Sequence, residues 1–144
     1  MIRLLVADDH GIVRRGIADI VSGTPDIVVE GEASSGEEAL ALARSKRFDV
    51  VILDISMPGR GGLDVIRDIR EAIPGVKIII LSIHSEEQFA VRSLRDGASA
   101  YLTKAGADAE LIDAIHTVAS GHRYITSEVA ERLALGGELA HVAA

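Results

Sequence analysis

Apolar residues in this chain are concentrated in five short runs that end in polar or turn-forming residues. Runs of about four to eight residues with this composition predict strands buried on both faces, because helices covering both sides of a parallel sheet leave no polar face. The runs are 2–7, 27–33, 50–53, 77–81 and 100–103. The run at 27–33 includes Glu30 and Glu32, so we expect this strand nearer the sheet edge.

Between the runs, apolar residues recur every three or four positions, which predicts amphipathic helices. We expect the first helix from Gly11 to Val21, the third from Leu63 to Ile73 and the fifth through Leu111 to Gly121. The second helix should begin at a capping box of Ser35 and Glu38 and run to about Arg44. The fourth should begin at a capping box of Ser85 and Gln88 and run to Gly97. Residues 126–135 predict a short extra helix before the tail.

Strands that alternate with helices indicate a parallel sheet with right-handed crossovers and helices on both faces. For five strands the common doubly wound arrangement is the flavodoxin-like order 2-1-3-4-5. We therefore expect an α/β fold with this five-stranded parallel sheet, five helices and a short C-terminal linker helix. We divide it into a domain over 1–121 and a linker helix and tail over 122–144.

Size and charge narrow the class of protein. A chain of 144 residues with 48% hydrophobic residues has the apolar content for one core. Its net charge of −7 argues against direct binding of nucleic acid by this chain. The lack of cysteine excludes disulfides and zinc thiolate sites. The apolar runs are shorter than the roughly 18 residues of a membrane span, and acid follows the first run too early for a secretory signal. We expect a cytoplasmic protein without a membrane contact.

Chemically useful residues stand where the predicted strands end. Asp8 and Asp9 follow the first strand, Asp54 the third, Ser82 the fourth and Lys104 the fifth. Because all strands of a parallel sheet point the same way, their carboxyl ends share one edge, and in the order 2-1-3-4-5 these four strands are neighbours. The sequence thus predicts one site containing three carboxylates, a hydroxyl and an ammonium.

Three converging carboxylates repel one another unless a cation lies among them. Oxygen ligands without a nearby histidine or cysteine suit Mg²⁺, which favours carboxylates and phosphate oxygens. Asp54 is then suited to attack a phosphoryl donor, with Mg²⁺ and Lys104 stabilising the transferred group. We expect His10 and His84 to be exposed polar residues.

Each of these residues alone has an ordinary structural explanation. Asp54 fits a turn cap, Asp8 and Asp9 fit a helix amino end, Ser82 a turn and Lys104 a solvated surface. Four strands that each end in a residue type needed for phosphoryl transfer favour the functional interpretation.

These residues, in Asp8-Asp9, LDISMPGRGG, KIIIL-Ser82 and AYLTK, resemble the receiver domain of two-component response regulators over residues 2 to about 120. The resemblance implies that Asp54 is the phosphoacceptor, Asp9 a direct Mg²⁺ ligand, Asp8 a ligand through water and Ser56 a ligand through its backbone carbonyl. It also implies that a sensor histidine kinase supplies the phosphate and that the domain catalyses its own phosphorylation and dephosphorylation without being an enzyme in its own right.

The same resemblance implies roles for the surrounding residues. Lys104 would pair with the phosphate, and Ser82 and Tyr101 would change conformation together as the switch. Ser56 and His84, each two residues past a site residue, would tune the phosphate's lifetime. Many receivers have proline after this lysine, and Ala105 stands there instead, which leaves the geometry of the 104–105 peptide open.

The segments VADDHGIVRRGI and YLTKAGADAELIDAIHTVASGHRYITSEVAERL are similar to the NarL/FixJ class. This similarity implies a homodimer on phosphorylation and DNA binding through a C-terminal helix-turn-helix that this chain does not contain. We favour a receiver domain excised from a longer protein, and a natural single-domain phosphorelay or interaction regulator without DNA binding is the alternative.

Two rival functions are considered. One is a Mg²⁺-dependent phosphatase, which needs a second acid where Ser56 stands, and the other is a structural interaction module with a silent site.

Overall fold

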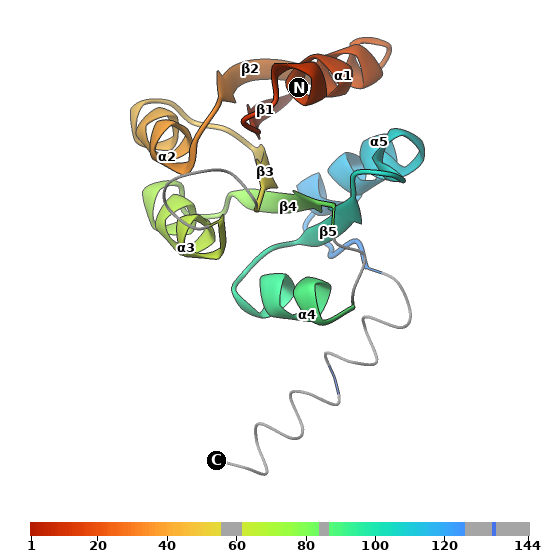
Figure 1. The fold of residues 1–144 in the computed structure, drawn as a ribbon. Coiled ribbons are helices and arrows are strands. Elements are labelled where there is room, and N and C mark those ends of the chain that lie inside the picture. Colours follow the sequence, from red (N-terminus) through yellow and green to blue (C-terminus); the bar gives the residue numbers. More distant parts are fainter. Residues whose placement is uncertain (56–61, 84–86, 126–133, 135–144) are drawn as a thin grey trace, which may run out of the picture.

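The computed structural model describes residues 1–55, 62–83, 87–125 and 134, and it forms a parallel sheet between two layers of helices (Figure 1). The strands are β1 (Ile2–Ala7), β2 (Ile27–Ala33), β3 (Val50–Asp54), β4 (Lys77–Ser82) and β5 (Ala100–Thr103). All four pairings are parallel and the order is β2-β1-β3-β4-β5, so the predicted five-stranded flavodoxin-like topology is confirmed.

Five helices connect and cover the strands. They are α1 (Gly11–Ser22), α2 (Gly36–Ser45), α3 (Gly62–Ala72), α4 (Glu87–Arg95) and α5 (Ala107–Ala119). Helices α1 and α5 lie on one face of the sheet, and α2, α3 and α4 lie on the other (Figure 1). Helix α5 begins at Ala107, which belongs to the core beneath α1 and α5, and the acidic Asp108 and Glu110 in its first turn favour the positive end of the helix dipole.

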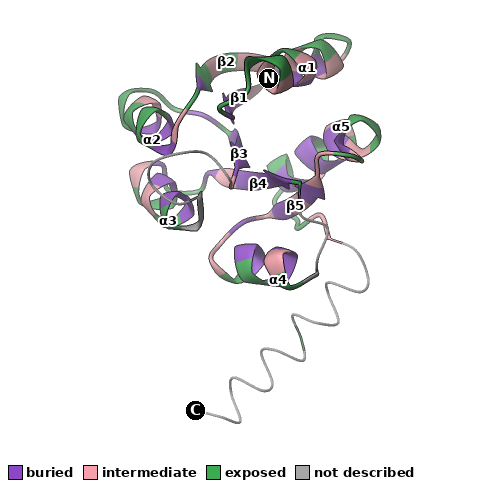
Figure 2. Cartoon of the chain, in the orientation of Figure 1, coloured by how far each residue is buried: buried purple, intermediate pink, exposed green. Residues whose placement is uncertain are grey.

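Side chains of the central strands alternate between two cores. In β3, Val51 and Leu53 belong to the core beneath α2, α3 and α4, whereas Val50 and Ile52 belong to the core beneath α1 and α5. All four are 0% exposed, and Figure 2 shows the strands buried between the helices. Because β3 is covered on both faces, its position in the sheet is fixed by packing, and the residue that ends it is held rigidly.

The second helix begins at one half of the predicted capping box. The Ser35 hydroxyl accepts a hydrogen bond from the Glu38 backbone N–H at 3.1 Å, while the Glu38 carboxylate accepts one from the Ser34 hydroxyl at 3.2 Å. The second predicted box depends on Ser85, and both Ser85 and the predicted helix over 126–135, apart from residue 134, lie outside the described residues.

The chain after α5 turns back onto the domain. Gly121 adopts a positive φ of 96°, and the Tyr124 backbone N–H then donates to the Ser99 carbonyl at 3.0 Å. Tyr124 forms a parallel bridge with Ala100 and packs against the α1 and α5 core, and Ile125 packs against the opposite core. These residues therefore cover part of the free edge of β5.

Two further expectations concern the backbone and the membrane. The described residues contain no cis peptide, so Ala105 follows Lys104 through a trans bond. Within the described ranges, no helix has the length and apolar character needed to cross a membrane.

Candidate functional site

The carboxyl-end edge of the sheet brings three aspartates together. Asp8 and Asp9 directly follow β1, and Asp54 is the last residue of β3. These strands are neighbours in which Ala7 pairs with Leu53, so their ends lie side by side. Asp8 is 1% and Asp54 0% exposed, whereas Asp9 is exposed. The predicted convergence of these residues is therefore present, with two carboxylates buried and one open to solvent.

Lys104 contacts both buried carboxylates. Its Nζ lies 3.0 Å from Asp8 Oδ2 and 3.3 Å from Asp54 Oδ2. The Lys104 backbone N–H donates to the Ser82 carbonyl at 2.8 Å, which fixes the lysine just beyond the pair of β4 and β5. Burial by itself lowers the Lys104 pKa, but the hydrogen bonds and charges of Asp8 and Asp54 outweigh it and raise the pKa above 10.5. The ammonium therefore stays charged within the site.

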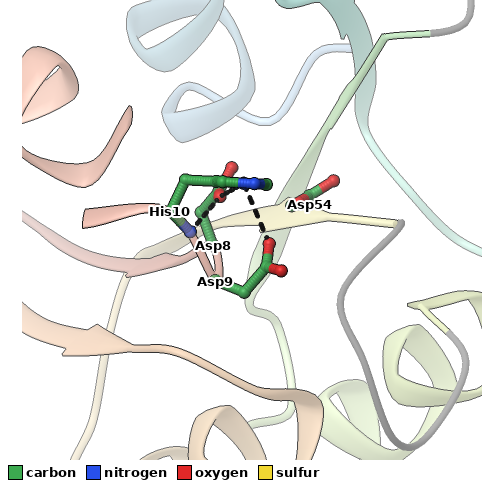
Figure 3. A group of neighbouring side chains, drawn as sticks. All are labelled: Asp8, Asp9, His10 and Asp54. Atoms are coloured by element: carbon green, nitrogen blue, oxygen red, sulfur yellow. Dashed lines mark hydrogen bonds and ion pairs between the residues drawn. The ribbon is translucent and has the colours of Figure 1, made fainter. Parts of the chain in front are cut away.

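The donor set fits a hard divalent cation. Ligand atoms of Asp8, Asp9, His10 and Asp54 all lie within 4.8 Å of one another (Figure 3). Asp8 Oδ2 is buried and is paired with the Lys104 ammonium, 3.0 Å away. Buried carboxylates need positive charge nearby, and carboxylates are the protein ligands that Mg²⁺ prefers.

His10 is part of this site, so our expectation that no histidine lies near the carboxylates is wrong. Its Nδ1 lies 3.2 Å from Asp8 Oδ1 and 3.1 Å from Asp9 Oδ1, and its backbone N–H donates to Asp8 Oδ1 at 2.8 Å. His10 is the N-cap of α1 and has no side-chain capping bond. Its ring is free to turn toward the aspartates, and its adjacency to Asp9 was the available sequence signal.

Arg14 is a second residue that the sequence pattern did not single out. Its Nη1 donates to the Asp8 carbonyl oxygen, and its Nε lies 3.1 Å from Glu32 Oε1. Arg14 thereby connects the end of β1 to β2 and holds the backbone that carries the acidic pair. A contact of this kind depends on helix packing, which spacing along the chain does not specify.

The predicted switch residues lie on the two strands beyond Asp54. Ser82 ends β4, is 1% exposed and pairs in register with Thr103, while Asp54 pairs with its neighbour Leu81. Tyr101 is half-buried and packs against the core beneath α2, α3 and α4. The structure thus places Ser82 at the site's edge and Tyr101 toward the α4 side. Ser56 and His84 lie outside the described residues.

Three comparisons with known proteins are consistent with this geometry. The family model for the response regulator receiver domain matches residues 4–116. The response regulator UvrY of Escherichia coli strain K12 is 44% identical over 135 residues, which cover 94% of this chain and 62% of UvrY. The chain therefore spans about three-fifths of the length of this curated relative.

Two solved structures share the fold. A two-component response regulator of the LuxR family from Aurantimonas sp. SI85-9A1 has a TM-score of 0.83 and 34% identity, covering 93% of this chain and 96% of that one. The isolated REC domain of RcsB from Salmonella enterica serovar Typhimurium, solved in the presence of the phosphomimetic BeF₃⁻, has a TM-score of 0.81 and 25% identity, covering 90% and 96%. This chain belongs to the response regulator receiver domain family.

Proposed function

We propose that the chain is a phosphorylation switch in which Asp54 accepts a phosphoryl group. The observation that carries the proposal is the contact of one ammonium, Lys104 Nζ, with Asp54 Oδ2 at 3.3 Å and Asp8 Oδ2 at 3.0 Å, at the end of the central strand. A carboxylate oxygen of Asp54 attacks the phosphorus of the donor, a P–O bond forms, and the donor's bond to phosphorus breaks. Lys104 is positioned to pair with the oxygens of the transferred group.

Asp8, Asp9 and Asp54 would hold Mg²⁺, together with the backbone carbonyl of Ser56, which lies outside the described residues. When bound, the ion would neutralise charge on the carboxylates and on the phosphoryl oxygens. The burial of Asp8 and Asp54, with Asp9 beside them, supports this assignment. The exposed Asp9 leaves the site open to solvent on one side, which suits entry of a phosphodonor.

The switch would operate through Ser82 and Tyr101. Added negative charge on Asp54 favours a hydroxyl donor nearby, and Ser82 ends the strand next to the one that carries Asp54. Tyr101 lies in β5 and packs against the core beneath α2, α3 and α4. This packing would respond to a shift of Ser82 and of the loop that follows it. Ser56 and His84 would tune the phosphate's lifetime.

The family and the extra length of UvrY support the partners that we propose. A sensor histidine kinase would supply the phosphate, and the domain, over 1–121, would catalyse its own phosphorylation and dephosphorylation. Residues 122–144 would form the linker helix and tail that connect it to a DNA-binding domain. UvrY extends beyond the segment that matches this chain, which supports such a domain. We expect a cytoplasmic protein that forms a homodimer on phosphorylation and regulates transcription.

The test is phosphorylation of the chain by acetyl phosphate in Mg²⁺, measured as a mass increase of one phosphoryl group. Asp54→Asn removes the nucleophile and should abolish the increase. Asp19→Asn, which changes an exposed carboxylate on α1, is the matched control and should be phosphorylated normally. Phosphorylation of Asp54→Asn at the wild-type rate would refute the assignment.

Sedimentation with and without beryllofluoride tests the dimer, and an unchanged monomer would contradict it. A phosphorylated chain that remains monomeric would favour the alternative of a single-domain phosphorelay or interaction regulator. Acetyl phosphate turnover without accumulation of a stable phosphoprotein would instead favour the phosphatase rival.

A further inference from the structure

His10 places a nitrogen donor at the proposed Mg²⁺ site. Asp8 uses its two oxygens differently: Oδ2 lies 3.0 Å from Lys104 Nζ, and Oδ1 lies 3.2 Å from His10 Nδ1. His10 Nδ1 is also 3.1 Å from Asp9 Oδ1 (Figure 3). One ring nitrogen is therefore close to a carboxylate oxygen of each neighbouring aspartate.

These separations are hydrogen-bond or ion-pair distances, and they are also close to the spacing of neighbouring ligands in a metal centre. Two ligands bound at about 2.1 Å and at right angles to each other lie about 3.0 Å apart, which is the spacing of neighbouring positions in an octahedral complex. The distances from Nδ1 to the two oxygens, 3.2 and 3.1 Å, are close to this value. Asp54 supplies a further oxygen, since the ligand atoms of all four residues lie within 4.8 Å of one another.

The chemistry of the nitrogen decides which ions benefit. Imidazole is a ligand for Zn²⁺, Ni²⁺ and Cu²⁺, whereas Mg²⁺ prefers carboxylate, carbonyl and water oxygens. For a given set of nitrogen and oxygen ligands, affinity rises along the first row toward Cu²⁺. A nitrogen beside the acidic pair therefore raises the affinity for late transition ions without a comparable gain for Mg²⁺.

We infer that the acidic site at the end of β1 also binds late first-row divalent ions, with His10 Nδ1 as a ligand beside the carboxylates of Asp8 and Asp9. This inference rests on the proposed Mg²⁺ site, because the same aspartates serve both ions. Ni²⁺ and Mg²⁺ consequently compete for the site. His10 is 64% exposed in its side chain and needs no opening of the fold to coordinate an ion.

The backbone of His10 has a role that is separate from that of its ring. The His10 N–H donates to Asp8 Oδ1 at 2.8 Å, so the residue that provides the nitrogen also holds the aspartate beside it in place. A substitution of the ring leaves this backbone hydrogen bond intact. The loss of the nitrogen ligand is therefore separable from a displacement of Asp8.

The experiment measures binding of Ni²⁺ and of Mg²⁺ to the full chain by calorimetric titration at one pH. His10→Gln should weaken Ni²⁺ binding by about tenfold or more, while the Mg²⁺ affinity changes by less than about twofold. His122→Gln, which changes an exposed histidine after α5, is the matched control and should leave both affinities unchanged. In a Cu²⁺ titration, the nitrogen hyperfine splitting in the EPR spectrum of the wild type should disappear in His10→Gln.

Two outcomes would overturn the inference. One is an unchanged Ni²⁺ affinity in His10→Gln, and the other is an equal loss for Ni²⁺ and Mg²⁺, which would mean that His10 only positions the carboxylates. Failure of the proposed function has a different signature. If the wild type binds Ni²⁺ through His10 but does not bind Mg²⁺, the inference holds and the proposed Mg²⁺ site is refuted.

Discussion

Lys104 Nζ lies closer to Asp8 Oδ2, at 3.0 Å, than to Asp54 Oδ2, at 3.3 Å. The lysine therefore neutralises the carboxylate of the proposed metal site as well as the proposed phosphoacceptor. Its side chain is 18% exposed, so this contact is only partly screened by solvent. The charge balance of the two buried carboxylates therefore depends on one residue, Lys104, at the end of β5.

Lys104→Met should destabilise the metal-free protein by about 1 to 3 kcal/mol, because it leaves two buried carboxylates without their ammonium. Mg²⁺ should stabilise this variant more than the wild type, since the ion restores the missing positive charge. Urea unfolding with and without Mg²⁺ measures both effects. Lys46→Gln, which removes an exposed ion pair with Glu30 at 3.4 Å, is the control and should cost less than about 1 kcal/mol. Equal costs for the two variants would contradict the prediction.

The contribution of Lys104 should disappear on the alkaline side. Its pKa is raised above 10.5, so the stability it provides is fully present below that pH and is lost as pH rises through the higher folded-state pKa. In metal-free buffer, the difference in unfolding free energy between wild type and Lys104→Met should stay constant from about pH 8 to about pH 10 and then shrink. A difference that stays constant through the alkaline range would indicate an unshifted pKa, and one that grows as pH rises would indicate a lowered pKa.

Tyr124 should titrate above its ordinary pKa of 10.0. Burial raises the pKa first, and the negative charge of Glu110, whose Oε1 accepts the phenol's hydrogen bond at 3.2 Å, raises it further. The chain has two tyrosines, so Tyr101→Phe leaves Tyr124 as the only phenol in an ultraviolet titration. Adding Glu110→Gln should move the midpoint back toward 10.0.

The same shift has a consequence for stability. The neutral phenol is favoured in the folded state, so its contribution is present below pH 10.0 and declines as pH rises from there through the folded pKa. A midpoint at or below 10.0 in Tyr101→Phe would show that the segment after α5 does not hold Tyr124 against Glu110.

Two glycines should respond in opposite ways to alanine. Gly97, which follows α4, has a φ of 116°, and a Cβ there would lie 2.8 Å from Arg70 Cδ, so Gly97→Ala should cost about 1 to 2 kcal/mol. Gly16 lies inside α1, where a Cβ would meet nothing within 4 Å, so Gly16→Ala should gain about 0.5 to 1 kcal/mol. Thermal unfolding of both variants checks the signs, and a shift in the same direction for the two would contradict this reading of the backbone.

Much of the fold was determined by the sequence alone. Runs such as 50–53 and 78–81 are apolar throughout because both faces of their strands are covered, and this pattern fits few other structures. Alternation with helices then fixes a parallel sheet. It also fixes that Asp8, Asp54 and Lys104 reach the same edge, since parallel strands end together.

The distances and partners within the site were decided by tertiary structure. Lys104 contacts Asp8 as closely as it does because the loop after β5 is bonded through its backbone to Ser82, a contact between strands with no local signal. His10 is the N-cap residue of α1, and its ring, which makes no capping bond, turns toward the aspartates, while Arg14 reaches the Asp8 carbonyl only once α1 has packed. Hydrophobic spacing specifies which elements form and which edge they share. Which polar atoms come within about 3 Å of each other depends on helix placement and side-chain rotamers, and these are set only when the core is packed.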